Sequence, residues 1–335
     1  MHNRKTKQEE QIMKSAGWVK DGINTKRTKP LGTNKHGALF YLKRDWQLYL
    51  LLLIPLVFAL IFKYGSMAGL VIAFKDYKIL KGFAGSKWVG FQVFEKVFAM
   101  RDFGKSVRNT LLLNGLTLIF GFPMPILLAL LLNEIKNKYF KSITQTLLYL
   151  PHFLSFVIIG AIAYQIFGQA SGIVNNLIEA CNGTRIPFLQ EDNHWLITYV
   201  AISVWQSMGW GTIIYLAAIT GVNTELYEAA TVDGAGRWAK CINITLPCIK
   251  GTIVTLLIMN LGKIMGGSFE SVYALMNVAT TKFTTTIPVL VYNYGIKSGK
   301  FSEATAIGLF QSVVGLILVL AADRFAKKLG EEGLL

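Results

Sequence analysis

The sequence predicts an all-α integral membrane protein with about six transmembrane helices. Of the 335 residues, 53% are hydrophobic and only 16% are Asp, Glu, Lys or Arg, and the mean hydropathy is +0.44. Soluble domains carry roughly 25% charged residues, so this chain lacks the polar surface that would cover a soluble core. Six apolar blocks meet the length needed to cross a hydrocarbon layer, about 20 residues at roughly 1.5 Å each.

The six blocks lie near residues 46–65, 108–132, 143–167, 195–221, 251–275 and 303–325. Trp46 and Tyr49 give the first block the aromatic edge that membrane interfaces favour. The third block contains Pro151, which a membrane helix can hold because neighbouring helices and Ser or Thr side chains satisfy the freed carbonyl. We therefore expect a transmembrane domain over residues 46–328, between a basic tail over 1–45 and a short tail over 329–335.

Basic residues indicate how the helices are oriented. The first 45 residues carry eleven Lys and Arg against four Asp and Glu, and Lys327 and Lys328 follow the last block. Cytoplasmic segments are rich in Lys and Arg, so we expect both termini on the inner side of a bacterial cytoplasmic membrane. The loop over 66–107 then lies outside, although it holds seven Lys and Arg of its own. Within it, residues 88–103 are predicted either as an amphipathic surface helix or as an ordered cap over the bundle.

Several function classes lack the residues they need. The net charge of +15 does not indicate nucleic-acid binding, because the charges lie between apolar blocks or in the first 45 residues. The three cysteines and four histidines show no metal-ligand spacing. The nearest approach to a phosphate-binding loop ends at Gly104-Lys105-Ser106 but starts with Ala99 in place of glycine. We therefore expect no catalytic residue, no metal and no cofactor in this chain.

Residues 223–247, between the fourth and fifth blocks, predict a helix, a turn and a second helix. Asn223 or Thr224 can cap the first helix, because a side-chain oxygen there accepts a free backbone N–H. Gly234 and Gly236 permit a sharp reversal of the chain. The segment therefore reads as a compact hairpin of helices between two membrane spans.

A pattern inside this loop resembles a known family. Glu228-Ala229-Ala230 is followed after three residues by Gly234, and nine further residues lead to Ile244-Thr245-Leu246-Pro247. This pattern is similar to the EAA loop of permeases in binding-protein-dependent ABC importers. The resemblance implies the type I ABC importer permease fold, in which the short helix docks into a groove of a separate cytoplasmic ATPase. Small side chains at Ala229 and Ala230 suit such a close approach.

The resemblance also implies roles and partners. Glu228 and Asp233 are expected to contact the ATPase, and Gly234 to make the bend. The complete ATPase-coupling set that it implies is Glu228, Ala229, Ala230, Asp233, Gly234, Ala235, Leu246 and Pro247. The implied partners are a second homologous permease subunit, an ATPase dimer that binds ATP and Mg, an extracytoplasmic solute-binding protein and the lipid bilayer.

Shorter runs resemble the carbohydrate branch of that family, the maltose-type permeases that import oligosaccharides and polysaccharide fragments. They are Gly69–Tyr77, Trp88–Phe91, Asn109-Thr110, Tyr149–His152, Gly308–Phe310 and the ending 330–335. The basic loop over 66–107 is compatible with an acidic oligosaccharide, and the same lysines could instead simply be solvated. Two alternatives stay open at this point: the same architecture importing a non-sugar solute, and a secondary transporter or channel that works alone.

Polar and aromatic side chains in the fourth and fifth blocks are candidates for the substrate pathway, because polar groups inside a membrane are costly. The candidates are Trp205, Gln206, Trp210, Asn260, Lys263 and Glu270. Rings can stack on the apolar faces of sugars, and amides can bond their hydroxyls. Lys263 and Glu270 lie about 10 Å apart along a regular helix, too far to pair, unless Gly266-Gly267 breaks it. The same side chains could instead contact the partner permease, bond a neighbouring helix or anchor the membrane interface.

Overall fold

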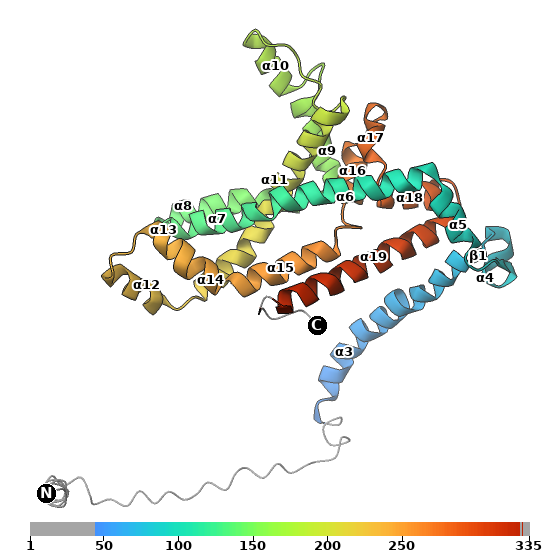
Figure 1. The fold of residues 1–335 in the computed structure, drawn as a ribbon, viewed down its shortest axis with the longest axis horizontal. Coiled ribbons are helices and arrows are strands. Elements are labelled where there is room, and N and C mark those ends of the chain that lie inside the picture. Colours follow the sequence, from blue (N-terminus) through green and yellow to red (C-terminus); the bar gives the residue numbers. More distant parts are fainter. Residues whose placement is uncertain (1–43, 329, 331–335) are drawn as a thin grey trace, which may run out of the picture. The chain divides into compact units, whose positions relative to one another are not determined.

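The structure, a computed structural model, describes residues 44–328 and 330 (Figure 1). The predicted tails over 1–45 and 329–335 therefore lie almost wholly outside the described residues. The chain divides into two compact units, Met1–Ser66 and Met67–Leu335. Four helices of the described part are long and apolar enough to cross a membrane, and up to six if each of two bent pairs is one span. The predicted all-α membrane fold with about six spans is confirmed.

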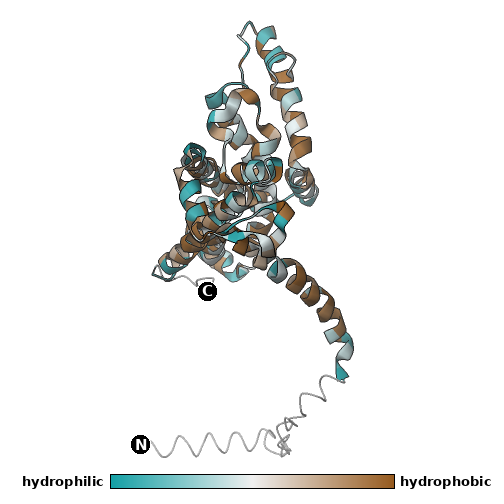
Figure 2. Ribbon diagram, turned by 90° about the vertical axis from the view of Figure 1, so that its right-hand side faces the viewer, coloured by the Kyte–Doolittle hydropathy of each residue, from teal (hydrophilic) through white to brown (hydrophobic). Residues whose placement is uncertain are grey.

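The first unit contains one apolar helix, α3 (Trp46–Ala59), which continues as a π-helical turn over Leu60–Gly65. Hydrophobic residues cover α3 along most of its length (Figure 2), and none of its residues is buried. A helix that is apolar on all sides is suited to a lipid environment. These bounds agree with the first predicted span.

The second unit opens with a small folded cap. A 3-10 helix (Ala68–Phe74) leads into β1 (Lys75–Asp76), which pairs antiparallel with β2 (Lys87–Trp88). A 3-10 turn (Ile79–Lys81) and α4 (Gly82–Gly85) connect the two strands, and α5 (Gln92–Ala99) follows. Val93 and Val97 of α5 are buried in one cluster with Ile307. Because the apolar face of α5 packs on protein, the ordered cap is favoured over a helix lying in the membrane surface.

The second span is longer than predicted. α6 (Arg101–Gly121) and α7 (Pro123–Glu134) together form a stretch of 34 residues with a break at Phe122. Pro123 opens α7, a position at which the N–H that proline lacks would have had no acceptor within that helix. α7 packs along α11 (Asp192–Thr220), a straight span of 29 residues.

The third predicted block is not a straight helix. α8 (Lys138–Tyr149) and the 3-10 turn Leu150–Phe153 meet α9 (Phe156–Phe167) at 104°. Pro151 cannot donate a backbone hydrogen bond. Ser155 then starts a new helix, since its hydroxyl accepts from the Ile158 N–H at 3.4 Å. The expectation of one continuous span over 143–167 is therefore corrected to a bent pair.

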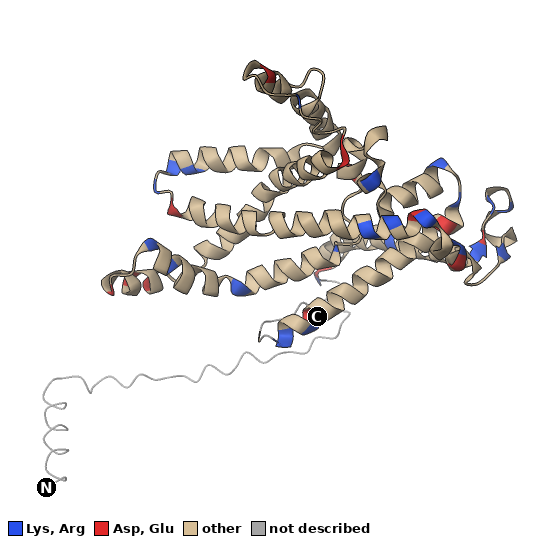
Figure 3. Cartoon of the chain, turned by 45° about the horizontal axis from the view of Figure 1, so that its top comes forward, with Lys and Arg blue, Asp and Glu red and all other residues tan. Residues whose placement is uncertain are grey.

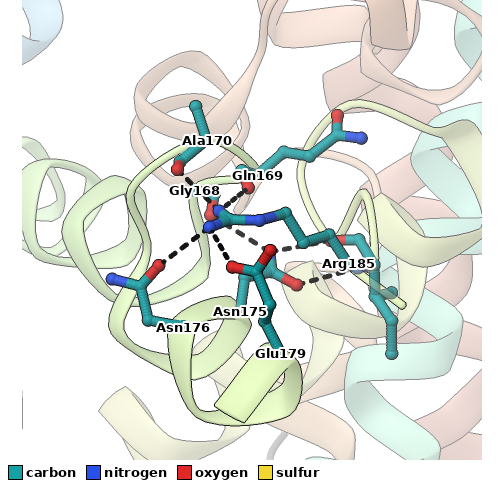
Figure 4. Close-up of polar contacts among 8 residues, drawn as sticks. Gly168, Gln169, Ala170, Asn175, Asn176, Glu179 and Arg185 are labelled. Atoms are coloured by element: carbon teal, nitrogen blue, oxygen red, sulfur yellow. Dashed lines mark hydrogen bonds and ion pairs between the residues drawn. The ribbon is translucent and has the colours of Figure 1, made fainter. Parts of the chain in front are cut away.

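α10 (Ile173–Ala180) and the segment after it extend away from α9 and α11 (Figure 1). Arg185 donates to the carbonyls of Gln169 and Ala170 at 2.8 and 2.6 Å and forms an ion pair with Glu179 at 2.5 Å (Figure 4). Each of these bonds is charge-assisted, so the guanidinium ties the two ends of the extension together.

The predicted hairpin between the fourth and fifth blocks forms from four short elements. They are α12 (Thr224–Val232), α13 (Arg237–Lys240), a π-helical turn (Cys241–Thr245) and α14 (Leu246–Cys248). α15 (Lys250–Gly262) leaves the hairpin after a bend of 61°. α15 ends before Gly266-Gly267, and α16 (Phe269–Leu275) follows, so the fifth block is broken at the predicted glycines.

The remaining elements lead to the last span. A 3-10 turn (Val278–Thr280), α17 (Thr281–Thr284), α18 (Ile287–Tyr292) and a π-helical turn (Asn293–Lys297) precede α19 (Phe301–Lys328). Charged residues gather at helix ends and in connections (Figure 3). The middles of the long helices stay apolar, as a bilayer requires.

Candidate functional site: coupling loop and polar cleft

The hairpin over 223–247, called the coupling loop below, is built by local capping. The Asn223 side chain accepts a hydrogen bond from the Glu225 N–H at 3.0 Å, so Asn223 rather than Thr224 is the cap of α12. At the other end, the Ala235 N–H donates to the Ala230 carbonyl at 2.8 Å. Gly234 takes a φ of +77°, a conformation that residues with a side chain rarely adopt. Gly234 alone therefore makes the reversal, because Gly236 has an ordinary φ of −71°.

The outer surface of the coupling loop is uncovered. Glu228, Ala229 and Asp233 are exposed, and no ion pair joins either carboxylate to another described residue. Beside them, Val232 and Trp238 have exposed fractions of 89% and 80%. Large apolar side chains next to free carboxylates form a surface that fits a protein partner better than water or lipid.

Three side-chain contacts brace the coupling loop from behind. The Tyr227 and Thr245 hydroxyls hydrogen-bond at 2.9 Å, and Thr245 is buried. Arg237 Nε lies 3.5 Å from a Glu134 carboxylate oxygen at the end of α7. The first helix of the loop is therefore tied to the π-helical turn over Cys241–Thr245, and the loop as a whole is tied to a neighbouring span.

The third brace joins Lys240 to Thr231, whose hydroxyl accepts from the lysine ammonium at 2.7 Å. Sequence reasoning missed these bracing residues, because each pair is at least nine positions apart and no local period links the two partners. Of the remaining predicted coupling residues, Leu246 packs against the cluster that contains Ile249, whereas Pro247 is exposed. Leu246 thus lies where the loop joins the packed helices and not on the outer surface of the loop.

A cleft of about 370 Å³ lies between α6, α11 and α15, and it is called the polar cleft below because polar side chains interrupt its largely apolar lining. It brings together three predicted pathway residues, Trp210, Asn260 and Lys263. Three further polar residues that the sequence did not single out line the same cleft: Asn114, Thr117 and Ser207. The Asn114 amide donates to the Ile264 carbonyl at 2.7 Å, so α6 is held against the end of α15.

Trp210 is positioned by a ring contact. His152, from the turn after α8, stacks on it with centroids 4.8 Å apart and planes 13° apart. The Asn260 amide donates to the Leu256 carbonyl at 2.8 Å, which leaves its oxygen free to accept. Lys263, the C-cap of α15, is exposed and adds a positive charge without a carboxylate partner among the described residues. The cleft therefore offers a ring, amides, hydroxyls and one cation.

The other three predicted pathway residues lie elsewhere. Trp205 borders an apolar groove of about 610 Å³ between α6 and α11. Gln206 is half-buried on α11 and Glu270 is exposed on α16, and neither lines the polar cleft. Lys263 and Glu270 form no ion pair with each other, although the helix is broken between them.

The metal-ligating side chains do not gather into a metal site in the part of the chain that the structure describes. No group of three or more His, Cys, Asp and Glu side chains there could hold a metal ion, and the cysteines are free.

Long apolar helices, an exposed helical hairpin between two spans and a polar cleft among the helices together define a membrane transport permease. Residues 121–331 match the binding-protein-dependent transport system inner membrane component family, and the chain belongs to that family.

Relatives agree with this assignment. The chain is 44% identical over 314 residues to Protein LplB of Bacillus subtilis (strain 168), a match that covers 93% of this chain and 99% of that protein. It is 46% identical over 287 residues to the polygalacturonan/rhamnogalacturonan transport system permease protein YteP of the same organism, covering 86% of this chain and 89% of YteP. Among solved structures, a bacterial alginate ABC transporter in complex with an alginate pentasaccharide-bound periplasmic protein contains a similar chain. That chain is 38% identical with a TM-score of 0.81, and the match covers 89% of this chain and 99% of that one.

Proposed function

We propose that this chain is the membrane-spanning permease subunit of an ATP-driven oligosaccharide importer. The observation that carries the proposal is the uncovered surface of α12 around Glu228, Ala229 and Asp233, on a hairpin that is braced internally and against α7. In this proposal a separate ATPase dimer binds ATP and Mg and docks on that surface. A second, homologous permease subunit completes the pathway, and an external solute-binding protein hands over the solute.

The proposed orientation places both termini and the coupling loop in the cytoplasm. ATP binding closes the ATPase dimer and pulls α12. The Arg237–Glu134 ion pair passes this motion to α7, and the Tyr227–Thr245 bond passes it toward α15. The cleft between α6, α11 and α15 then faces alternately outward and inward.

The chemistry of the cleft suits a carbohydrate. The Trp210 ring offers a flat apolar surface, and the amides of Asn260 and Asn114 can exchange hydrogen bonds with hydroxyls. Lys263 supplies a cation that a carboxylate would neutralise. Two relatives carry names of acidic polymers, polygalacturonan and alginate. We therefore propose an acidic oligosaccharide as the solute, and the basic cap over 67–100 agrees with it.

The test is uptake of radiolabelled oligogalacturonate by cells that express the complete importer. Glu228→Lys is expected to abolish uptake, because it reverses a charge on the docking surface, while the protein stays in the membrane. Gly234→Val is expected to do the same, because valine is strained at a φ of +77°. Gly236→Val is the matched control: its φ is ordinary and a Cβ there meets open space, so uptake is retained.

Normal uptake by both Glu228→Lys and Gly234→Val would contradict the coupling role. Uptake that persists after deletion of the cognate ATPase would instead identify a secondary transporter. Uptake of a neutral or non-sugar solute in place of oligogalacturonate would overturn the solute class alone.

A further inference from the structure

Three aromatic rings pack into a cluster in the part of the chain that follows α15. Phe269 and Tyr273 lie on α16, and Tyr292 ends α18. The three ring centroids are 5.2 Å from one another in every pair, with one stacked, one tilted and one edge-on arrangement. Tyr273 is 38% exposed, and the other two rings are half-buried. The cluster is thus open on one side and supported on the other.

A cation lies over this cluster. Lys297 Nζ is 5.5 Å from the ring centroids of both Tyr273 and Tyr292. Lys297 follows Tyr292 by five residues, and the π-helical turn Asn293–Lys297, about one turn of helix, returns the chain to the same side as Tyr292. Lys297 is exposed, and no carboxylate of a described residue lies within ion-pair distance of it. Its charge is held by rings and left without a counterion.

The cluster borders an open and largely apolar groove of about 660 Å³. Phe269 and Tyr292 line this groove, whereas Tyr273 and Lys297 lie outside its lining. Its polar lining residues are Thr305, Gln311 and Ser312 of α19, and Gly266 makes room for Gln311, because a Cβ there would meet the Gln311 amide nitrogen at 2.5 Å. The two rings and these few hydroxyl and amide groups match the two kinds of surface that a sugar presents.

The cluster is also close to the polar cleft. Lys263, which lines the cleft, precedes Phe269 by six residues, so the two Cα atoms are separated by at most roughly 20 Å. The turn between them shortens this span, since the Lys263 carbonyl accepts from Gly266 at 2.9 Å and from Gly267 at 3.1 Å. An oligomer could therefore reach from one site to the other.

We propose that Phe269, Tyr273, Tyr292 and Lys297 form a subsite that receives one uronate residue of the oligosaccharide before it enters the cleft. This inference rests on the proposed function. The rings stack on the apolar face of the sugar, and the Lys297 ammonium pairs with its carboxylate. Tyrosine and lysine also anchor proteins at membrane interfaces, so the experiment must distinguish a solute subsite from a membrane anchor. The carboxylate of Glu270, the exposed neighbour of Phe269, repels an anion. Glu270→Gln removes this charge and is therefore expected to raise the uptake rate of the acidic solute.

The experiment uses the complete importer in proteoliposomes with its solute-binding protein and trigalacturonate as the probe. Lys297→Gln is expected to lower the uptake rate about fivefold at sub-saturating solute, and Lys297→Arg is expected to retain it because the charge is kept. Tyr273→Leu is expected to lower the rate similarly. Lys300→Gln is the matched control: Lys300 lies over Tyr294 at 5.4 Å in the same connection, outside the cluster, and its loss leaves uptake unchanged.

Two further readouts separate a solute subsite from other roles. The affinity of the loaded binding protein for the importer is expected to be the same in Lys297→Gln and wild type, and a loss of that affinity would overturn the subsite in favour of a protein contact. Uptake by Lys297→Gln that tracks the anionic lipid content of the vesicles would overturn it in favour of a membrane anchor. Equal uptake by Lys297→Gln and wild type would overturn the subsite alone, whereas absence of trigalacturonate uptake by the wild type would overturn the proposed solute.

Discussion

Tyr227 ties the coupling helix to the chain that returns to the membrane. Its hydroxyl bonds the buried Thr245 hydroxyl, 18 residues further along the chain, at 2.9 Å. A hydrogen bond of this kind contributes about 1 kcal/mol net, so its loss weakens the brace without unfolding the loop. In the proposed mechanism, this hydroxyl pair therefore affects how firmly a motion of α12 is passed on.

Tyr227→Phe tests this brace. Solute uptake per ATP hydrolysed is expected to fall a few-fold, while the amount of importer in the membrane stays constant. Tyr139→Phe on α8, where the ring is 71% exposed, is the control and should behave as wild type. Unchanged coupling in Tyr227→Phe would show that the hydroxyl pair carries no motion.

Gly209 allows α8 and α11 to approach each other closely. A Cβ at this position of α11 would overlap the Leu148 backbone carbonyl of α8. Gly209→Ala is expected to destabilise the purified protein by about 1–3 kcal/mol through overpacking, seen as a lower unfolding temperature in detergent. Gly115→Ala on α6 meets open space and is expected to leave that temperature unchanged.

At the scale of elements, α12 depends on its first turn. It has nine residues, too few to be stable alone, so its cap matters. Asn223→Ala removes the acceptor for the Glu225 N–H and is expected to cost about 1 kcal/mol of helix stability.

The expected readout for Asn223→Ala is weaker stimulation of the partner ATPase by loaded binding protein. Asn223→Asp keeps an accepting oxygen and should restore the stimulation. If alanine and aspartate behave alike, the cap has no part in docking.

At the scale of the whole molecule, α11 lies between the α10 extension and the coupling loop. The α10 extension precedes this 29-residue span, and the coupling loop follows it. If α11 crosses the membrane once, as the proposed orientation requires, we expect Cys181 and Val232 on opposite sides of it.

Labelling with a membrane-impermeant maleimide in intact cells tests this arrangement. Cys181, which is exposed, should react in a variant that lacks the other two cysteines. A lone cysteine at position 232, introduced as Val232→Cys in a cysteine-free background, should react only after the membrane is permeabilised, although Val232 is 89% exposed. Equal reaction of both from outside would contradict a cytoplasmic coupling loop.

By itself the sequence determined the apolar spans, the hairpin over 223–247 and its glycine reversal. Apolar content is a property of a run of residues, and capping joins atoms only a few positions apart, so both can be read locally. The break at Gly266-Gly267 was predictable for the same reason.

Only the tertiary structure decided which side chains share a site. The rotation of each span placed Trp210, Asn260 and Lys263 around one cleft and left Trp205 in an apolar groove. The bend of 104° between α8 and α9 set His152 on Trp210. These contacts depend on how helices far apart in the chain are turned and packed, and no local pattern encodes that choice.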